Sequence, residues 1–436
     1  MPPMTLNDWL ARIELMHPTV VEMGLERVQA VRRRLGLAPS FPIIVVGGTN
    51  GKGSVCAMLE AMLAAAGYRV GCYTSPHLLR YNERVRVDRG EASDRELCES
   101  FADVERARGD VSLTYFEFGT LAAVALFVRA DVDVAILEVG MGGRLDAVNA
   151  FDADCAVITS VDIDHVAYLG HTREAIGFEK AGIFRSGRPA VCAAPSPPAS
   201  VRAHAAAIGA DLLEIGRDFD FRCNRLNWRF RRTGAAPLVL PYPQLRGAFQ
   251  LSNASAAIAA LSHLSDRLPV PEGAIRAGLV SASVSGRFQV LRHEPAVVVD
   301  VAHNPHAAAA LARNLDGLTA GGRNLAVFAM LADKDIDGVV EALKDRIDEW
   351  LVADLQEPRG ASAVDLARTL RSHGVERCLG GFDRPGLAYR HALEHLAAPG
   401  DRVIVFGSFH TVADVLREDA TEAASPPRSI LRAVPA

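Results

Sequence analysis

The stretch PIIVVGGTNGKGS, residues 42–54, decides the fold of this chain. It is an apolar run of strand type that leads into a glycine-rich turn, and the alanine-rich helical pattern of residues 55–66 follows directly. Glycines let backbone N–H groups converge on a polyphosphate, and a helix N-terminus adds partial positive charge. Lys52 supplies a mobile cation, and Ser54 offers a hydroxyl to a magnesium ion. The layout predicts a phosphate-binding loop.

This loop departs from the common spelling G-x-x-x-x-G-K-[ST], because Gly53 stands between the lysine and the hydroxyl. An ordinary glycine-rich turn between a strand and a helix is the alternative interpretation. Strand, glycines, lysine, hydroxyl and helix occur together here, and that combination favours the phosphate loop.

Length, charge and cysteine usage limit the class of protein. A chain of 436 residues exceeds one usual domain, so we expect two domains, each with its own core. A formal net charge of -5 and the lack of a long basic tract argue against nonspecific nucleic-acid binding. The seven cysteines are scattered without a C-x-x-C pair, which is typical of a reducing cytosol. No signal-peptide pattern or apolar run of about 18 residues occurs, so we expect a soluble, cytoplasmic protein that does not span a membrane.

Strand and helix patterns alternate along the chain and change character near residues 283–289. We expect an α/β phosphate-loop domain with a mainly parallel sheet over residues 1–284, followed by a linker at residues 285–289. A second, smaller α/β domain is expected over residues 290–418. Its strands are expected near residues 296–300, 324–329, 350–353 and 402–406. The tail at residues 419–436 is rich in alanine, proline and serine, and we expect it to be disordered.

Polar residues stand at the ends of several expected strands. Ser75, Glu138 and His165 each end or follow a strand of the first domain. The carboxyl ends of parallel strands share one edge of a sheet, and open α/β sheets bind ligands there. A carboxylate at the end of a buried strand is costly unless it is paired or binds a cation. Glu138 is therefore a candidate magnesium ligand.

Other polar positions keep two interpretations open. Thr114 and Glu117 have the spacing of a helix capping box, so they can be structural. Lys180 stands at the expected end of a helix, where a lysine is usually a solvated charge. Asp300 and His303 follow the first strand of the second domain, again at a carboxyl end.

Taken together, the motifs resemble one family: folylpolyglutamate synthase and dihydrofolate synthase, within the Mur-ligase-like ATP-dependent amide ligases. Any single motif can arise by chance, but their joint occurrence in this order is specific and runs through nearly the whole chain. The motifs are Gly48–Ser54, Thr74–Leu78, Tyr115–Glu117, Glu138–Ala147, Asp164-His165 with Leu169-Gly170, Glu179–Phe184, Gly247–Gln250 with Asn253, Gly286–Phe288, Asp300–His306, Asp333–Asp335 and Gly407-Ser408. The resemblance implies a Mur-ligase central domain and a smaller, Rossmann-like C-terminal domain.

The resemblance also implies sites for ATP and two magnesium ions. The ATP contacts would be Thr49, Asn50, Gly51, Lys52, Gly53, Ser54, Asn253, Arg287 and Asp300. The first magnesium ion would lie near Ser54, Ser75, Glu138 and His165. Lys180 matches a lysine that these ligases carbamylate as a ligand of the second ion, which reverses its interpretation as a solvated charge. Ala248-Phe249 departs from the turn of many relatives, so Asn253 is preferred to Gln250 as a nucleotide contact.

Substrate positions carry over in the same way. The pterin-bearing substrate is expected near Met23, Gly24, Leu25, Thr114, Tyr115, Phe116, Glu117, Leu145, Asp146 and Ala147. We hypothesise that His303 and Ser408, at strand ends of the second domain, help to bind glutamate. His303 could equally order the loop around Asp300. The predicted catalytic groups are Lys52, Lys180, His165 and His303.

The implied reaction joins L-glutamate to dihydropteroate and to the γ-carboxylate of reduced folates. A carboxylate is a poor electrophile, so ATP would phosphorylate it and the glutamate amine would displace phosphate from the acyl phosphate. Positioning and charge neutralisation carry phosphoryl transfer, which suits a lysine, glycine amides and magnesium ligands. A cleft between two domains would keep water from the acyl phosphate.

The sequence leaves alternative functions open. The opening segment around Glu22 to Arg27 resembles that of bacterial bifunctional enzymes, so we expect both activities, and an enzyme that only lengthens the glutamate tail is the alternative. A cell-wall Mur ligase is the rival within the superfamily, and an ATP-binding switch without catalysis is the rival from another class. Family members are commonly monomers, so we expect a monomer.

Overall fold

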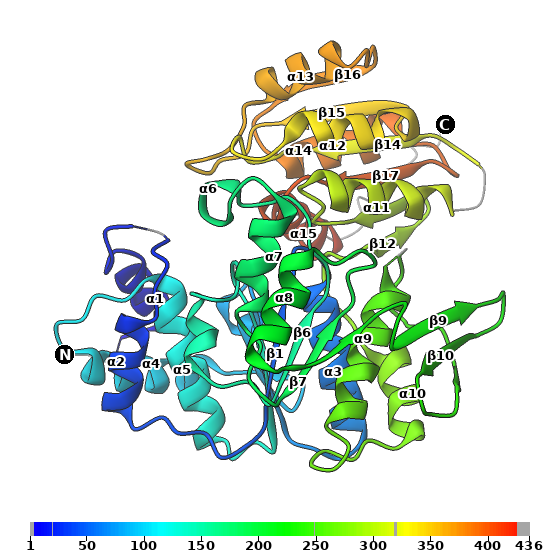
Figure 1. Cartoon of the computed structure of the whole chain (residues 1–436). Coiled ribbons are helices and arrows are strands. Elements are labelled where there is room, and N and C mark those ends of the chain that lie inside the picture. Colours follow the sequence, from blue (N-terminus) through cyan, green and yellow to red (C-terminus); the bar gives the residue numbers. More distant parts are fainter. Residues whose placement is uncertain (1–3, 20, 248, 318–320, 425–436) are drawn as a thin grey trace, which may run out of the picture. The chain divides into compact units, whose positions relative to one another are not determined.

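The structure is a computed structural model that describes residues 4–19, 21–247, 249–317 and 321–424 (Figure 1). The chain divides into two compact units, Met1–Val284 and Ser285–Ala436.

The first unit is built on an eight-stranded sheet with the order β4-β3-β2-β5-β1-β6-β7-β8. Its strands are β1 (Ile43–Gly47), β2 (Val70–Tyr73), β3 (Val85–Val87), β4 (Gly90–Glu91), β5 (Val134–Glu138), β6 (Cys155–Ile158), β7 (Pro189–Cys192) and β8 (Asp211–Glu214). The run from β2 to β8 in this order is parallel, while β3 and β4 pair antiparallel at one edge. β2, β5, β1 and β6 are consecutive in this order, so the four strand ends predicted to carry the site are neighbours.

The apolar run of β1 is buried on both faces because its side chains alternate. Ile43 and Val45 join one core, and Ile44 and Val46 join the core on the opposite face. The first face is covered by α1 (Leu6–Glu14), α2 (Glu26–Leu35), α4 (Asp94–Arg108), α5 (Tyr115–Arg129), α7 (Arg173–Ala181) and α8 (Ala199–Ile208). The second is covered by α3 (Lys52–Ala65), α9 (Gln250–His263) and α10 (Glu272–Ser281) (Figure 1).

Smaller elements complete this unit. A three-stranded antiparallel sheet is formed by β9 (Phe219–Cys223), β10 (Trp228–Arg232) and β11 (Leu238–Leu240). Trp228 is fully buried in the α3 and α9 core, which attaches this sheet to the main layers. Short helical turns are formed by Tyr81–Arg84, Ala147–Ala150 and α6 (Val166–Leu169).

The second unit has a six-stranded sheet with the order β12-β13-β17-β14-β15-β16. The strands are β12 (Gln289–His293), β13 (Ala296–Val299), β14 (Asn324–Phe328), β15 (Glu349–Ala353), β16 (Cys378–Phe382) and β17 (Arg402–Phe406). β12 is antiparallel and the other strands are parallel. The helices are α11 (Pro305–Asp316), α12 (Ile336–Leu343), α13 (Ala363–Ser372), α14 (Pro385–His391) and α15 (Phe409–Ala424), with short turns at Lys344–Arg346 and Ala392–Leu396.

The predicted α/β class with mainly parallel sheets is confirmed, but two boundaries differ. Gln289, placed in the linker, is the first residue of β12. The prediction that the tail is disordered from residue 419 onward is wrong for residues 419–424, because these residues continue α15. Asp419 accepts hydrogen bonds from Arg292 and Tyr389, and these contacts with two other elements hold the last turns of the helix. Residues 425–436 lie outside the described residues. Within the described chain, no helix combines the length and apolar character that crossing a membrane requires.

Candidate functional site

The phosphate-type loop after β1 is held in place by the two residues that directly follow β6. Thr49 N–H donates to the carbonyl of Ser160 at 2.9 Å, and Asn50 N–H donates to Ser160 Oγ at 2.9 Å. Thr159 Oγ1 donates to the carbonyl of Asn50 at 2.6 Å. The loop backbone is therefore fixed before any ligand arrives, which lowers the entropy cost of binding a phosphate chain.

Two glycines give this loop its shape. Gly48 has φ +144°, and a Cβ there would lie 1.9 Å from Thr159 Oγ1. Gly51 has φ +90°, and a Cβ there would lie 2.6 Å from Oδ1 of Asn253 on α9. Both positions need glycine for backbone conformation and for space.

Lys52 begins α3, and its ammonium turns back onto its own loop. Lys52 Nζ donates to the carbonyls of Gly48 and Thr49 at 3.1 and 3.3 Å. The cation is therefore held at the mouth of the loop, where a phosphate would compete for it. The pocket beside it is lined by Gly48, Thr49, Lys52, Val139, Gly140, Met141, Gly142, Asp164, His165, Leu169 and Lys180.

Lys180, at the end of α7, is buried and only 4% exposed. Burial and the nearby Lys52 charge lower its pKa to about 7, although Asp164 and Asp146 oppose the shift. The interpretation as a solvated helix-end charge is wrong, because α7 turns this residue into the pocket instead of towards water. A pKa of about 7 leaves a substantial fraction of the amine neutral and nucleophilic at neutral pH.

Glu138 ends β5, is 4% exposed and faces the loop. Its Oε2 accepts the Ser75 N–H at 3.1 Å and lies 3.9 Å from the position that a Cβ at Gly53 would take. Ser54, also buried, accepts a hydrogen bond from Gln250 Nε2 at 3.3 Å. Ser75 and Glu138 therefore adjoin the Gly53-Ser54 end of the loop.

The donor set fits a hard cation. Across the described residues, no group of three or more His, Cys, Asp and Glu could by itself hold a metal ion. The predicted ligands Ser54 and Ser75 are hydroxyls beside one carboxylate, which is the sparse oxygen set that Mg²⁺ accepts when substrate phosphates and water supply the remaining positions. His165 lines the pocket and has a left-handed backbone conformation, with φ +52°. Its backbone N–H donates to Asp164 Oδ1 at 2.8 Å.

The start of α9 brings two amide side chains to the loop. Asn253 Nδ2 donates to Gln250 Oε1 at 3.0 Å, and Gln250 contacts Ser54. Both residues therefore adjoin the loop, so geometry does not favour Asn253 over Gln250 as the preference from the sequence did. Ala248, part of the departure noted in this turn, lies outside the described residues.

The predicted substrate residues of the first unit come from three segments that meet. Gly24 N–H donates to the Leu145 carbonyl at 3.4 Å. Tyr115 and Phe116 open α5, and the ring of Phe116 lies 2.8 Å from where a Cβ at Gly140 would be. Thr114 and Glu117 form the predicted capping box, with both hydrogen bonds present.

Asp146 is the most unusual titratable group among these residues. Its carboxylate accepts the N–H groups of Met141 and Val148 at 2.9 and 3.1 Å, and Ala147 follows it in a short helical turn. Burial raises the pKa of Asp146 to about 7 despite those hydrogen bonds. It can therefore exchange a proton near neutral pH.

In the second unit, Asp300 accepts the N–H groups of Phe288 and Ala302 at 2.9 and 2.8 Å. Burial raises its pKa, and the Arg287 charge opposes that shift. Arg287 and His303 both lie against the ring of Phe409, with 5.4 Å from the guanidinium carbon to the ring centre and 6.2 Å between ring centres. Phe409 directly follows the Gly407-Ser408 motif and is not among the site residues predicted from the sequence.

His303 and Ser408 both take part in local structure. His303 Nδ1 lies 2.8 Å from the Val301 carbonyl, and Ser408 is buried, where its Oγ contacts Thr411 Oγ1 at 2.6 Å and accepts the Thr411 N–H at 3.0 Å. These contacts support the loop-ordering interpretation of His303, and the glutamate role of both residues stays a prediction.

Two family models match the chain: the Mur ligase middle domain over residues 46–261 and the Mur ligase, glutamate ligase domain over residues 286–409. The dihydrofolate synthase/folylpolyglutamate synthase of Escherichia coli (strain K12) is 46% identical over 412 residues, which cover 94% of each chain. The chain belongs to the dihydrofolate synthase/folylpolyglutamate synthase family. Its relative from Haemophilus influenzae is 41% identical and covers 94% of this chain and 96% of its own.

Solved structures of this family superpose closely. E. coli FolC in complex with DHPP and ADP has a TM-score of 0.92 at 45% identity, and covers 97% of this chain and 99% of its own. The bifunctional enzyme from Yersinia pestis complexed with AMPPNP and a Mn ion has a TM-score of 0.88 at 47% identity, covering 96% and 98%. The resemblance stated from the sequence motifs, and the Mur-ligase fold that it implied, are thereby confirmed.

Proposed function

We propose that this chain is an ATP- and magnesium-dependent ligase that joins L-glutamate to dihydropteroate and to the γ-carboxylate of reduced folates. The observation that carries this proposal is the end-to-end similarity to bifunctional synthases, at 46% identity over 94% of the chain. The pocket that joins the Lys52 loop to His165 and Lys180 supports it, because phosphoryl transfer needs a cradle for phosphates. A cell-wall Mur ligase and a non-catalytic switch are less well supported.

The chain supplies positioning and charge. Backbone N–H groups of residues 49–54 and the N-terminus of α3 bind the phosphates, and Lys52 leaves the Gly48 carbonyl to neutralise the γ-phosphoryl group. The substrate carboxylate attacks that group, which gives an acyl phosphate and ADP. The uncharged amine of glutamate then attacks the acyl carbon, phosphate leaves, and the amine loses its proton as the amide forms. Because this intermediate reacts with water, the site has to exclude solvent.

Magnesium would be held by Ser54, Ser75, Glu138 and His165, with Lys180 as a carbamate for a second ion. When bound, the ions neutralise phosphate charge. The lowered pKa of Lys180 supports this assignment, since only the neutral amine adds to carbon dioxide, and it releases a proton as the carbamate forms. We assign Asn253, Arg287 and Asp300 to the nucleotide, and His303 and Ser408 to glutamate. We assign residues 23–25, 114–117 and 145–147 to the binding of dihydropteroate and reduced folates.

A substrate panel tests the proposal. Purified protein with ATP, magnesium and glutamate is given dihydropteroate, tetrahydrofolate monoglutamate or a nucleotide-linked muramyl peptide, and product is followed by mass spectrometry. Ligation of both pterin substrates is expected. Activity on tetrahydrofolate alone would indicate a monofunctional tail-lengthening enzyme, and activity on the muramyl substrate alone would overturn the proposal. The predictions of a monomer, of a cytoplasmic location and of no nucleic-acid partner stay predictions.

A further inference from the structure

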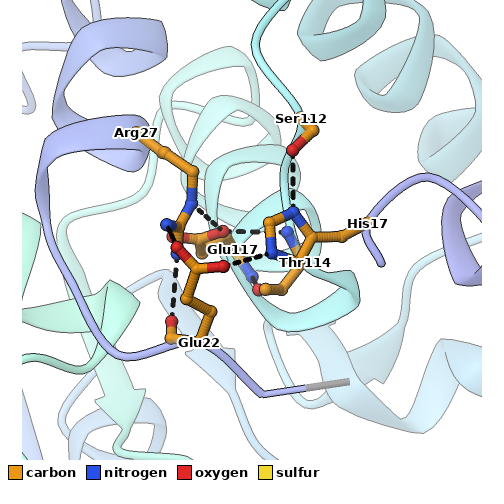
Figure 2. A network of polar contacts seen from close by, with 6 residues as sticks. All are labelled: His17, Glu22, Arg27, Ser112, Thr114 and Glu117. Atoms are coloured by element: carbon orange, nitrogen blue, oxygen red, sulfur yellow. Dashed lines mark hydrogen bonds and ion pairs between the residues drawn. The ribbon is translucent and has the colours of Figure 1, made fainter. Parts of the chain in front are cut away.

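A polar network beside the substrate segments uses residues that the predicted site does not include (Figure 2). His17, which follows α1, has a side chain that is only 6% exposed. Its Nδ1 lies 2.8 Å from Ser112 Oγ, and its Nε2 lies 2.8 Å from Glu22 Oε2. Both ring nitrogens are therefore engaged, and the ring connects the stretch before α5 to the stretch before α2.

Arg27, on α2, continues the network to α5. Its Nη2 donates to the Glu22 carbonyl at 3.0 Å and to Glu117 Oε1 at 3.0 Å, while Nε donates to Glu117 Oε2 at 3.3 Å. Nη1 donates to the carboxylate of Glu22. Glu117 is buried, so its charge needs a partner, and Arg27 provides a planar, two-pronged one (Figure 2).

The segment between these anchors, residues 21–25, contains Met23, Gly24 and Leu25 of the predicted substrate side. Beyond the network it is fastened by the Gly24 to Leu145 hydrogen bond. The methyl carbon of Met23 lies 3.5 Å from where a Cβ at Gly142 would be, on the wall of the Lys52 pocket. The network therefore sets the distance between this segment and the start of α5.

The capping box alone does not require this arrangement. Thr114 and Glu117 satisfy the first turn of α5 with their own two hydrogen bonds. Arg27 adds a link to Glu117 in the first turn of α5, and His17 adds a link to Ser112 in the stretch just before α5. His17 and Arg27 also both contact Glu22 in the segment of residues 21–25. What the network fixes is thus the relative position of two substrate segments.

We propose that His17 and Arg27 are positioning residues for the pterin-bearing substrate, and that they hold residues 21–25 in register with Thr114–Glu117. This inference rests on the proposed function for the identity of the substrate. It predicts that loosening the network weakens binding of the pterin substrate. The ATP loop should be unaffected, because its own anchors are Thr159 and Ser160, which follow β6.

The test uses the full chain with His17→Ala, His17→Gln and Arg27→Lys, and with Arg33→Ala as a control at an exposed position of α2. Gln keeps a donor and an acceptor, whereas Lys keeps the Arg27 charge but loses the two-pronged geometry. The rate of amide hydrogen exchange in peptides covering residues 21–25 measures how firmly this segment is held, and it does not depend on enzyme turnover. Steady-state kinetics then give the KM for dihydropteroate, ATP and glutamate separately, and thermal unfolding reports on folding.

His17→Ala and Arg27→Lys are expected to speed hydrogen exchange in residues 21–25. They are also expected to raise the KM for dihydropteroate by about tenfold, which is the size typical of one lost buried hydrogen bond. The KM for ATP is expected to change by less than about twofold. His17→Gln is expected to recover part of both effects, and Arg33→Ala to behave as wild type. Unchanged exchange would overturn the positioning role. Faster exchange with an unchanged dihydropteroate KM, or equal rises in all three KM values, would overturn the link to substrate. An inactive wild-type protein with the expected exchange pattern would instead count against the proposed function.

Discussion

The backbone N–H of Ser75 donates a 3.1 Å hydrogen bond to Oε2 of Glu138. This bond joins the turn after β2 to the end of β5, two strands that are neighbours in the sheet. It orients a buried carboxylate towards the Gly53-Ser54 end of the phosphate-type loop. The strand order thus brings together groups that lie about 60 to 90 residues apart in sequence.

Glu138→Gln separates the charge of this residue from its structural bond, because the Gln carbonyl can still accept the Ser75 N–H. The variant is expected to fold with a near-wild-type melting temperature and to need at least about tenfold more magnesium for half-maximal activity, since one anionic ligand is lost. A magnesium titration of the ligation rate measures this. Wild-type titration behaviour would reject the ligand role.

Lys180→Ala is expected to be nearly inactive, because the buried amine is the group assigned to the carbamate. Adding a short-chain carboxylate is expected to restore part of the turnover, since it supplies the missing oxygen ligands. Lys344→Ala, which removes a lysine from an ion pair with Glu341 in the second unit, is the matched control and should retain full activity. Full activity of Lys180→Ala without any additive would show that the reaction does not depend on this side chain.

The buried amine also predicts a pH dependence of stability. The pKa of Lys180 falls from 10.5 to about 7 on folding, so between these values the unfolded chain binds a proton that the folded chain does not. The free energy of unfolding of the wild type should therefore rise with pH across this window relative to Lys180→Met, because the full cost of burying the charge is felt only below pH 7. Urea unfolding of both proteins without nucleotide, magnesium or carbon dioxide measures the difference. A difference that does not change with pH would contradict the pKa shift.

Gly48→Ala tests the shape of the phosphate-type loop. The new Cβ would lie 1.9 Å from Thr159 Oγ1, whose hydrogen bond to the Asn50 carbonyl holds the loop. Gly67→Ala is the control, because Gly67 also has positive φ but has nothing within 4 Å. Both changes cost about 1 kcal/mol or more in backbone strain. Only Gly48→Ala should raise the KM for ATP, by at least about tenfold, because only this change displaces the backbone N–H groups that bind the phosphates. Equal KM values for ATP in the two variants would contradict the role of Gly48 in shaping the loop.

Local patterns predicted much of the fold. The continuous apolar runs of β1, β5 and β6 predict strands that are buried on both faces of a sheet, as the structure has them. The capping box of Thr114 and Glu117 was predicted from the spacing of these two residues. Residues 402–406 were predicted as a strand with the bounds that β17 has. The apolar strand and helical patterns placed the loop and Glu138 at strand ends and Lys180 near a helix end, as the structure has them, and the family resemblance supplied their expected roles.

Features that depend on distant partners could not be predicted. β16 contains two adjacent glycines, and both it and β12 are edge strands whose form comes from pairing with β15 and β13. The last turns of α15 depend on Asp419 meeting Arg292 and Tyr389. Arg27 and Glu117 are 90 positions apart, and nothing in either local sequence indicates that they form a pair.

The central claim is that the substrate carboxylate becomes an acyl phosphate before glutamate attacks, and oxygen labelling tests it most directly. Dihydropteroate with ¹⁸O in both carboxylate oxygens is turned over with ATP, magnesium and glutamate, and the released phosphate is analysed by mass spectrometry. An acyl phosphate predicts one ¹⁸O in each released phosphate and one ¹⁸O in the new amide. When the amine attacks, the bond between the acyl carbon and the bridging oxygen breaks, and that oxygen leaves with the phosphate. Unlabelled phosphate released alongside ligated product would contradict it.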